Sequence, residues 1–355
     1  MGIFQKLGEC FFSHKFPMVG VDISDTSIEL IQLQASLGKP KIKVNSRLEL
    51  EPGLIINGRI SDAGNLAVIL KAAFKKETFK SNYCLLSLPD KETYFLSIKA
   101  KDLDTEIYSQ AQENLPIDLQ QCYYDYIKTS NESAFFAAAP KQIIKQYLDV
   151  FKLAELNLQV VDFESACLAR TLITLEEMKE PTFIIDLGAK STDIILVDWQ
   201  GFNDQINFAL GGYFISQKIA DNLRQDFDQA EKIKLEKGIK IQGLDLEAII
   251  TEMYQPVFAE INKMSSKYET EKNIKPIKII LAGGTCLLKG LVDIFKKNLP
   301  GYDINLGNLE KKIDFKDKSL GKEQILYANV IGLALRGIND KSLNQGINLI
   351  KNFSA

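Results

Sequence analysis

Histidines and paired cysteines are what this sequence most clearly lacks. Its 355 residues include one histidine, His14, and five cysteines scattered without a C-x-x-C pair. A histidine-based zinc site or a Ser-His-Asp triad would therefore have to use His14 itself, and its place near the start of the chain argues against both. An odd number of cysteines without metal-binding spacing is typical of a protein in a reducing cytoplasm.

Long apolar runs and an excess of positive charge are also missing. No apolar run is long enough to cross a bilayer, so no membrane-spanning segment is predicted. The formal net charge of −3 gives no case for nucleic-acid binding. Hydrophobic residues make up 46% and charged residues 25% of the chain, as in ordinary globular proteins, and 355 residues favour two or more domains.

Residues 1–17 carry a crude apolar stripe at helical spacing, which includes Ile3, Phe4 and Leu7. The stripe lacks the uninterrupted apolar core and cleavage site of a signal peptide. We expect an N-terminal arm that docks or stays flexible, and a weak membrane-surface helix is the alternative.

The most informative stretch covers residues 183–198. Two β-branched apolar runs flank a polar turn that contains Asp186, Gly188 and Thr192, which predicts two buried strands joined by a tight turn. A carboxylate at the end of a buried strand can hold a hydrated Mg²⁺, and a neighbouring glycine lets backbone N–H groups approach a phosphate. Taken alone, the pattern fits an ordinary β-hairpin equally well.

Two further stretches strengthen the nucleotide interpretation. Residues 18–33 repeat the design, with a strand that ends in Asp22, a turn through small hydroxyl residues and a second strand. Residues 277–291 give an apolar strand, then Gly283 and Gly284, then a helix-like run. Two glycines between a strand and a helix permit close approach of a flat ligand to the helix N-terminus. Two related half-domains that face one nucleotide are therefore predicted.

The order of these three stretches resembles the actin/Hsp70/sugar-kinase superfamily. From about Val19 to about Ile350 the chain looks most like the PilM family of actin-like type IV pilus assembly proteins, and it is also similar to the FtsA family. The resemblance implies an α/β, actin-like (ribonuclease H-like) two-domain fold with an FtsA/PilM-type β-α-β-β-α-β insert in the first domain.

The predicted organisation follows from this resemblance and from local patterns. The insert is predicted to contain strands at 94–98, 123–128, 134–138 and 158–161 and helices at 104–114 and 141–153. Its place in the first half separates the chain from sugar kinases. A helix over 244–260 and a polar loop over 267–275 are expected before the third stretch. The expected parts are an arm at 1–17, a first domain at 18–180 with the insert at about 91–160, a second domain at 181–336 with a helical subdomain at about 214–275 and a closing helix at about 322–336, and a tail at 337–355.

The resemblance also implies how the chain would bind ATP and Mg²⁺. Asp22 and Asp186 would face each other across a cleft and orient Mg²⁺ on the phosphates through water. Gly283 and Gly284 would pass under the adenine. Glu231 and Lys234, which match an A-E-x-x-K pattern, would hold the ribose, although a solvated helix with i,i+3 charge pairs is the alternative. The remaining expected nucleotide-binding residues are Ser24, Thr26, Ser27, Gly188, Ser191, Thr192, Gly211 and Gly212.

Catalysis would depend on Glu164, which matches a position that orients the attacking water in bacterial actins. An N-terminal carboxylate favourable to the helix dipole is an equally weighted alternative. The first turn departs from the family pattern, because Ser24 replaces a glycine, Asp25 adds a negative charge and Glu29 stands where lysine is usual. Carboxylates near a triphosphate weaken its binding, so at most a slow ATPase is expected.

By resemblance, the protein would be a cytoplasmic scaffold at the inner face of the inner membrane. It would bind the N-terminal tail of a PilN-like inner-membrane protein in a groove between the insert and the first half-domain, touch the membrane only indirectly, and bind no nucleic acid. The family's partner carries an Ile-Asn-Leu-Leu-like motif, which residues 347–350 of this chain resemble. Self-association through this tail is one hypothesis, and a tail packed on its own domain is the alternative.

Two other functions compete with the scaffold. An FtsA-like division protein calls for a basic amphipathic helix after a linker, for which residues 351–353 are a poor candidate. A small-molecule kinase of the same superfamily calls for a catalytic aspartate in the first half, and no convincing loop supplies one. Whether the machine would serve pili, secretion or DNA uptake stays open.

Overall fold

A computed structural model describes residues 18–351 except positions 57, 78, 200, 316 and 317. The predicted arm at 1–17 lies outside the described residues. The chain divides into a first unit, Met1–Thr171 with Glu310–Ser319 and Tyr327–Ala355, and a second unit, Leu172–Leu309 with Leu320–Leu326. Across the described residues, no helix has both the length and the apolar character needed to cross a membrane.

The first unit is built on a five-stranded sheet in the order β10-β6-β1-β2-β3. The three strands at one side form an antiparallel meander, while β6 runs parallel to β1 and β10 runs parallel to β6. Seven of the eight residues of β2 are buried, as expected for a strand covered on both faces. The strands are β1 (Val19–Ile23), β2 (Ser27–Gln34), β3 (Lys41–Glu49), β6 (Tyr83–Leu88) and β10 (Asn157–Phe163), with a short pair β4 (Ile55–Ile56) and β5 (Arg59–Ile60) outside the sheet.

Helix α10 packs unusually close to the sheet and to α5. A Cβ at Gly20 of β1 would lie 2.6 Å from the carbonyl oxygen of Val330, and one at Gly332 would lie 2.1 Å from that of Cys167. Only glycine fits these contacts. The helices of the first unit are α2 (Ala63–Lys76), α3 (Leu103–Asn114), α4 (Lys141–Leu153), α5 (Glu164–Leu172), α10 (Ala328–Arg336) and α11 (Asp340–Leu343).

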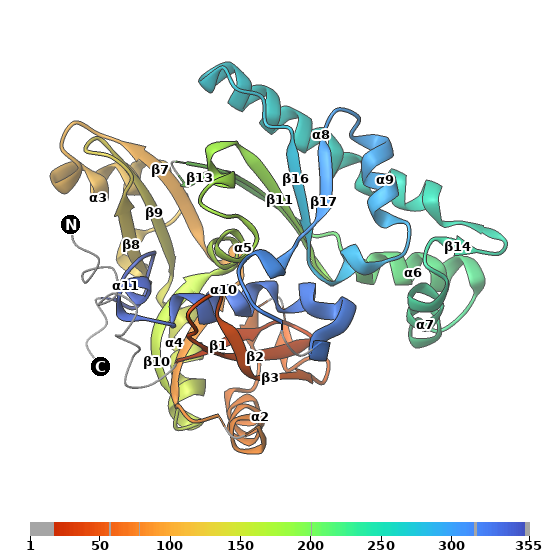
Figure 1. Cartoon of the computed structure of the whole chain (residues 1–355), viewed down its shortest axis with the longest axis horizontal. Helices are drawn as coiled ribbons and strands as arrows, with labels where there is room; N and C mark the ends of the chain where they lie inside the picture. The colour runs from red at the N-terminus through yellow and green to blue at the C-terminus, as the bar shows by residue number, and fades with distance from the viewer. Residues whose placement is uncertain (1–17, 57, 78, 200, 316–317, 352–355) are drawn as a thin grey trace. The chain divides into compact units, whose positions relative to one another are not determined.

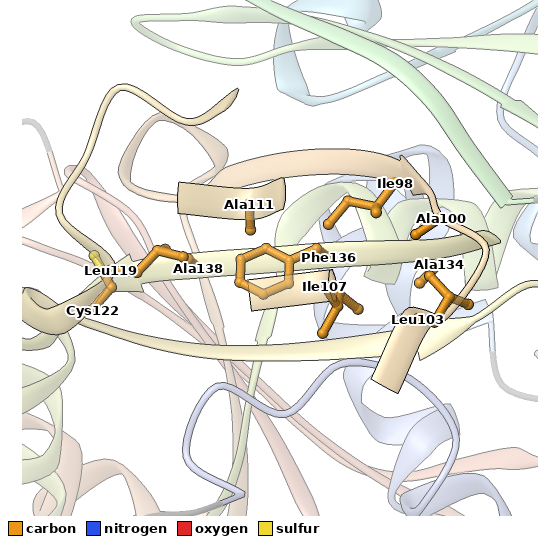
Figure 2. Packing of buried hydrophobic residues seen from close by; sticks show 10 residues of the cluster. All are labelled: Ile98, Ala100, Leu103, Ile107, Ala111, Leu119, Cys122, Ala134, Phe136 and Ala138. Atoms are coloured by element: carbon orange, nitrogen blue, oxygen red, sulfur yellow. The ribbon is translucent and has the colours of Figure 1, made fainter. Parts of the chain in front are cut away.

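The insert has a small sheet and core of its own. Strands β7 (Tyr94–Lys99), β8 (Cys122–Lys128) and β9 (Ser133–Pro140) form an antiparallel sheet in the order β7-β9-β8. Figure 2 shows its core, in which Phe136 of β9 and Ile107 of α3 belong to one buried cluster.

The element order β-α-β-β-α-β is present as expected, but its last two members need correcting. Helix α4 packs on α2, and β10 pairs with β6 in the five-stranded sheet. A chain that leaves β6 can form a parallel neighbour only after a long crossover. The insert and α4 supply that crossover. Strand β10 is therefore part of the five-stranded sheet, and α4 is one of the helices that pack around that sheet, so neither belongs to the insert.

The second unit repeats the topology of the first. Its five-stranded sheet has the order β13-β12-β11-β16-β17, again an antiparallel meander followed by two parallel strands (Figure 1). The prediction of two related half-domains is therefore confirmed. The strands are β11 (Thr182–Leu187), β12 (Thr192–Asp198), β13 (Gly201–Phe208), β16 (Lys278–Ala282) and β17 (Asp303–Leu306), with a hairpin β14 (Lys240–Ile241) and β15 (Leu244–Asp245).

Two helix predictions require correction. The polar segment expected as a loop at 267–275 continues α8 to Lys272, because Met264 and Tyr268 extend its buried face and the Tyr268 hydroxyl donates to Asp198 Oδ2 at 2.6 Å. The closing helix expected from about 322 begins as α10 at Ala328, after a 3₁₀ segment. The other helices of the second unit are α6 (Gly212–Leu223), α7 (Phe227–Lys237), α8 (Leu246–Lys272) and α9 (Leu291–Asn298). The 3₁₀ segments are η1 (Asp90–Glu92), η2 (Leu119–Gln121), η3 (Glu177–Lys179), η4 (Gly284–Leu287), η5 (Leu309–Lys311) and η6 (Lys318–Tyr327).

Candidate functional site

The turn between β1 and β2 is closed by Ser24. Its amide donates to the carbonyl of Ser27 at 2.9 Å, and its Oγ accepts from the amides of Thr26 at 3.2 Å and Ser27 at 3.0 Å. The expected phosphate-binding residues of this turn therefore lie together. Two of the amides that could face a phosphate donate instead to the serine that replaces glycine.

Asp22, near the end of β1, lies in a buried polar cluster with Ser87 of β6 and Asn329 of α10. Ser87 Oγ donates to Asp22 Oδ1 at 3.3 Å, and Asn329 Nδ2 donates to Ser87 Oγ at 3.0 Å. Burial raises the pKa of Asp22 to about 6, and hydrogen bonds from Asn329 and Ser87 offset only part of this effect. Asn329 Oδ1 is buried and has no hydrogen-bond partner among the described residues.

These two observations test the fit of a hydrated cation. A buried carboxylate whose hydrogen-bond donors among the described residues are neutral would be stabilised by positive charge, and the unpaired amide oxygen of Asn329 can accept from a metal-bound water. The residues around Asp22 fit hydrated Mg²⁺.

The two unusual carboxylates after Asp22 each have a structural partner. Asp25 Oδ1 accepts from the amide of Gly58 at 2.8 Å, and Glu29 forms an ion pair with Arg47 at 2.8 Å. Burial and the charge of Asp22 raise the pKa of Glu29 to about 7, although Arg47 acts in the opposite direction. Asp25 therefore holds the segment at Gly58, and Glu29 links β2 to β3.

Glu164 begins α5 and exchanges contacts with Asp90 of η1. Glu164 Oε2 accepts from the Asp90 amide at 3.4 Å, and the Asp90 carboxylate accepts from the Ser165 amide at 3.2 Å and from the Ser165 hydroxyl. This arrangement joins the start of α5 to the segment after β6. It agrees with the alternative in which Glu164 is a structural carboxylate at the helix N-terminus and does not position a water.

In the second unit, the turn between β11 and β12 is held by its own backbone. Gly188 donates to the carbonyl of Ser191 at 2.9 Å, and the Gly188 carbonyl accepts from the Gly212 amide at 3.1 Å and from Thr285 Oγ1 at 2.7 Å. Thr192 Oγ1 donates to the Leu210 carbonyl at 2.7 Å. The Thr192 hydroxyl thus stabilises the turn.

Glycines bring three distant segments of this unit into contact. Gly283 has a φ of +80°, and a Cβ there would lie 2.3 Å from Asp186 Oδ1 and 2.5 Å from the Leu187 carbonyl oxygen. A Cβ at Gly211 would lie 2.6 Å from the carbonyl oxygen of Gly188. The second half of the predicted site, spanning residues 186–188, 211–212 and 283–285, is therefore one cluster.

Glu231 and Lys234 of α7 are attached to the same cluster. Lys234 Nζ donates to the Gly212 carbonyl at 3.0 Å and to Glu231 Oε2 at 2.8 Å, and Ser216 Oγ also donates to Glu231. Lys234 is buried, so this i,i+3 pair is not a solvated surface pair. It fastens α7 to the first turn of α6.

Within each unit, the predicted residues of that unit lie close to one another. Among the described residues, no three histidine, cysteine, aspartate or glutamate side chains gather where they could ligate a metal directly. Sequence reasoning missed Ser87, Asp90 and Asn329, which have partners far away in the chain, and Ser216, which carries no local motif. Thr285 is different, because its place directly after the glycine pair was a usable signal.

Comparisons with known proteins identify relatives of this architecture. The profile of the family described as type IV pilus assembly protein PilM matches residues 20–338. The ethanolamine utilization proteins EutJ of Escherichia coli (strain K12) and Salmonella typhimurium are 25% and 24% identical over 123 residues. These matches cover 35% of this chain and only 40% of either relative.

Solved structures agree on the fold. The PilM-PilN type IV pilus biogenesis complex matches with a TM-score of 0.78 and 20% identity over 91% of this chain and 98% of that one. MreB5 of Spiroplasma citri bound to ADP matches with a TM-score of 0.58 and 11% identity over 93% and 97%. The fold is the expected actin-like, two-domain α/β fold with two mixed five-stranded sheets.

The glycine contacts predict that an alanine destabilises the folded protein strongly at Gly283 and only slightly at Gly243, the control position. Gly283→Ala forces a side chain against Asp186 and Leu187, whereas Gly243→Ala, at the same φ of +80°, meets nothing within 4 Å. We expect Gly243→Ala to lower the free energy of unfolding by about 1–2 kcal/mol and Gly283→Ala by about 3 kcal/mol or more. Urea unfolding measures both, and equal losses would contradict the close contact.

The raised pKa of Asp22 predicts that Asp22→Asn stabilises the ligand-free protein at neutral pH. The folded chain keeps a proton on Asp22 that the unfolded chain releases, so the contribution of Asp22 to stability falls as pH rises from about 4 to about 6 and stays low above that range, while Glu29 extends the fall of the wild type to about pH 7. At about 1.4 kcal/mol per tenfold change in the ionisation constant, the gain at pH 7.5 is at most about 3 kcal/mol. Unfolding without Mg²⁺ or nucleotide between pH 4 and 8 measures it. A variant less stable than wild type at pH 7.5 would contradict the prediction.

Proposed function

The chain belongs to the PilM family of type IV pilus assembly proteins, and on that premise we propose that it is an ATP-binding, actin-like scaffold. It serves the inner-membrane assembly platform of a type IV pilus or of a related secretion or competence machine. It works in the cytoplasm at the inner face of the membrane and binds the N-terminal cytoplasmic peptide of a PilN-like membrane protein.

The polar cluster around Asp22 is the main structural support for the proposed nucleotide binding. Its raised pKa and the unpaired oxygen of Asn329 fit a hydrated Mg²⁺ that arrives with ATP. Mg²⁺ would supply positive charge to the phosphates and to the carboxylates of Asp22 and Asp186. MreB5 of Spiroplasma citri, a structural relative, has been solved with ADP and with AMPPNP.

The remaining predicted residues divide into those that bind and those that position. In this proposal Gly283 and Gly284 pass under the adenine, and Glu231, which is half-buried beside Lys234, holds the ribose. Lys234 positions Glu231 and Gly212. The turn residues that would contact the phosphates are Ser24, Thr26, Ser27, Gly188, Ser191, Gly211 and Gly212, and Thr192 positions its turn through the Leu210 carbonyl.

Binding without fast turnover is the expected mode of action. Glu164 is already engaged with the Asp90 amide at the start of α5, and Ser24 takes up two amides of the phosphate turn. Both contacts oppose rapid water activation and tight phosphate binding. Bound ATP would therefore act mainly on the conformation of the scaffold, with slow hydrolysis at most.

The partner proposal has independent support. The PilM-PilN complex aligns over nearly the whole of this chain, and within the first unit the insert lies in the crossover between β6 and β10. A PilN-like peptide would bind where the insert adjoins the first sheet. Contact with the membrane is then made by the partner, and nucleic acid plays no part.

Calorimetric titration with Mg·ATP tests the nucleotide half of the proposal. We expect saturable binding to the wild type, a loss of at least about tenfold in affinity in Asp186→Ala because a carboxylate that faces Mg²⁺ is removed, and no change in Asp228→Ala. Asp228 is an exposed carboxylate of α7 and serves as the matched control. Absent wild-type binding, or equal binding by both variants, would contradict ATP binding at this site.

A further inference from the structure

The outer edge of the first sheet is covered by the chain's own last described residues. Strand β10 is the edge strand, and residues 347–351, here called the edge strip, lie along it. Leu349 donates its amide to the Val161 carbonyl at 2.9 Å, the Val161 amide donates to Asn348 Oδ1 at 3.1 Å, and Asn348 Nδ2 donates to the Gln159 carbonyl at 3.2 Å. An asparagine side chain thus substitutes for a peptide unit at a strand edge.

The insert supplies a second contact to the strip. Asp125 of β8, itself buried, accepts from the Asn348 amide at 2.9 Å and from Lys351 Nζ at 3.3 Å. Ile347 and Leu349 are 1% exposed and Ile350 is 8% exposed. Asp125, Gln159 and Val161, here called the docking edge, therefore bind one short segment that has buried aliphatic side chains, one asparagine and one basic residue.

Arg336 fastens the start of the strip, and a separate set of contacts holds the rest of it. The buried guanidinium of Arg336 donates to the carbonyls of Leu343 at 3.2 Å, Gly346 at 3.0 Å and Ile347. From Asn348 onward the hydrogen bonds described between the strip and the rest of the unit go to the docking edge, and the buried side chains of Leu349 and Ile350 add apolar packing. The strip can therefore leave the edge while Arg336 keeps the preceding residues in place.

We propose that the edge strip is a built-in competitor for a peptide-binding edge. A segment of another protein with the pattern aliphatic-Asn-aliphatic-aliphatic-basic would replace it, because each contact above depends only on that local pattern. The proposal rests on the proposed function, since it makes the docking edge the site of the PilN-like peptide and the strip its regulator.

Tethering decides how strongly the strip competes. A segment attached a few residues away acts at an effective concentration of about millimolar, so a free peptide binds more weakly than it would to an open edge. Release of the strip is therefore the step that any change in the first unit would have to favour before the partner binds.

The test uses the full chain and a fluorescent peptide of residues 344–351. Leu349→Asp puts a carboxylate where the strip is buried and expels it, and Asn348→Ala removes the side-chain pairing with β10. We expect anisotropy titrations to show peptide binding at least about tenfold tighter to each variant than to the wild type. The exposed Lys341→Ala serves as the control and should bind like the wild type.

A double variant and an altered peptide test whether the peptide binds at the docking edge. Adding Asp125→Ala to Leu349→Asp should weaken peptide binding, and a peptide that carries Asn348→Ala should bind poorly. Equal binding by wild type and both variants, or none by any of them while thermal unfolding shows folded protein, would overturn the proposal. Dimers of the wild type that Leu349→Asp abolishes would overturn it too, because the strip would then exchange between copies.

A second peptide separates this proposal from the proposed function. The N-terminal peptide of the PilN-like protein is titrated into the same variants. Binding of the 344–351 peptide without binding of the PilN-like peptide would overturn the assigned partner and keep a competing strip. Equal PilN-like binding with and without the strip would keep the partner and overturn the competition.

Discussion

The buried charge of Asp162 is the constraint on which the first unit depends. This carboxylate lies on β10 and is fully buried. Burial alone would raise its pKa, but the guanidinium groups of Arg336 and Arg170 outweigh that effect and hold the pKa of Asp162 below its ordinary value. Their nitrogens lie 2.6 Å and 2.9 Å from Asp162 Oδ2. Removal of one partner from such a buried group costs about 3–5 kcal/mol.

This ion network also organises the segments that matter for function. Arg170 comes from α5 and donates to the Gly332 carbonyl, while Arg336 comes from α10 and holds the carbonyls of Gly346 and of Ile347, the first residue of the edge strip. Asp22 differs, because its hydrogen-bond donors in the described part of the chain are neutral and burial raises its pKa. In one sheet, two arginines therefore neutralise the buried carboxylate of Asp162, whereas Asp22 is surrounded by neutral donors among the described residues.

Local patterns in the sequence were enough to predict both strand-turn-strand units and the glycine turn, since each is a short run of neighbouring residues. They could not predict Asn329, which is 242 positions from its partner Ser87 and sits in an ordinary helical pattern. They also misassigned β10, because a β-α-β-β-α-β order fits a separate insert and a crossover back to β6 equally well. The contact of Ser24 with two amides depends on turn geometry that the letters alone do not specify.

Hydrogen exchange most directly tests the proposal that this chain binds Mg·ATP. Amide exchange is compared in the full chain with and without Mg·ATP. We expect slower exchange in the turns at 22–27 and 186–192 and at 283–285, with the same dependence on nucleotide concentration. Protection confined to one unit, or no protection in either, would contradict it.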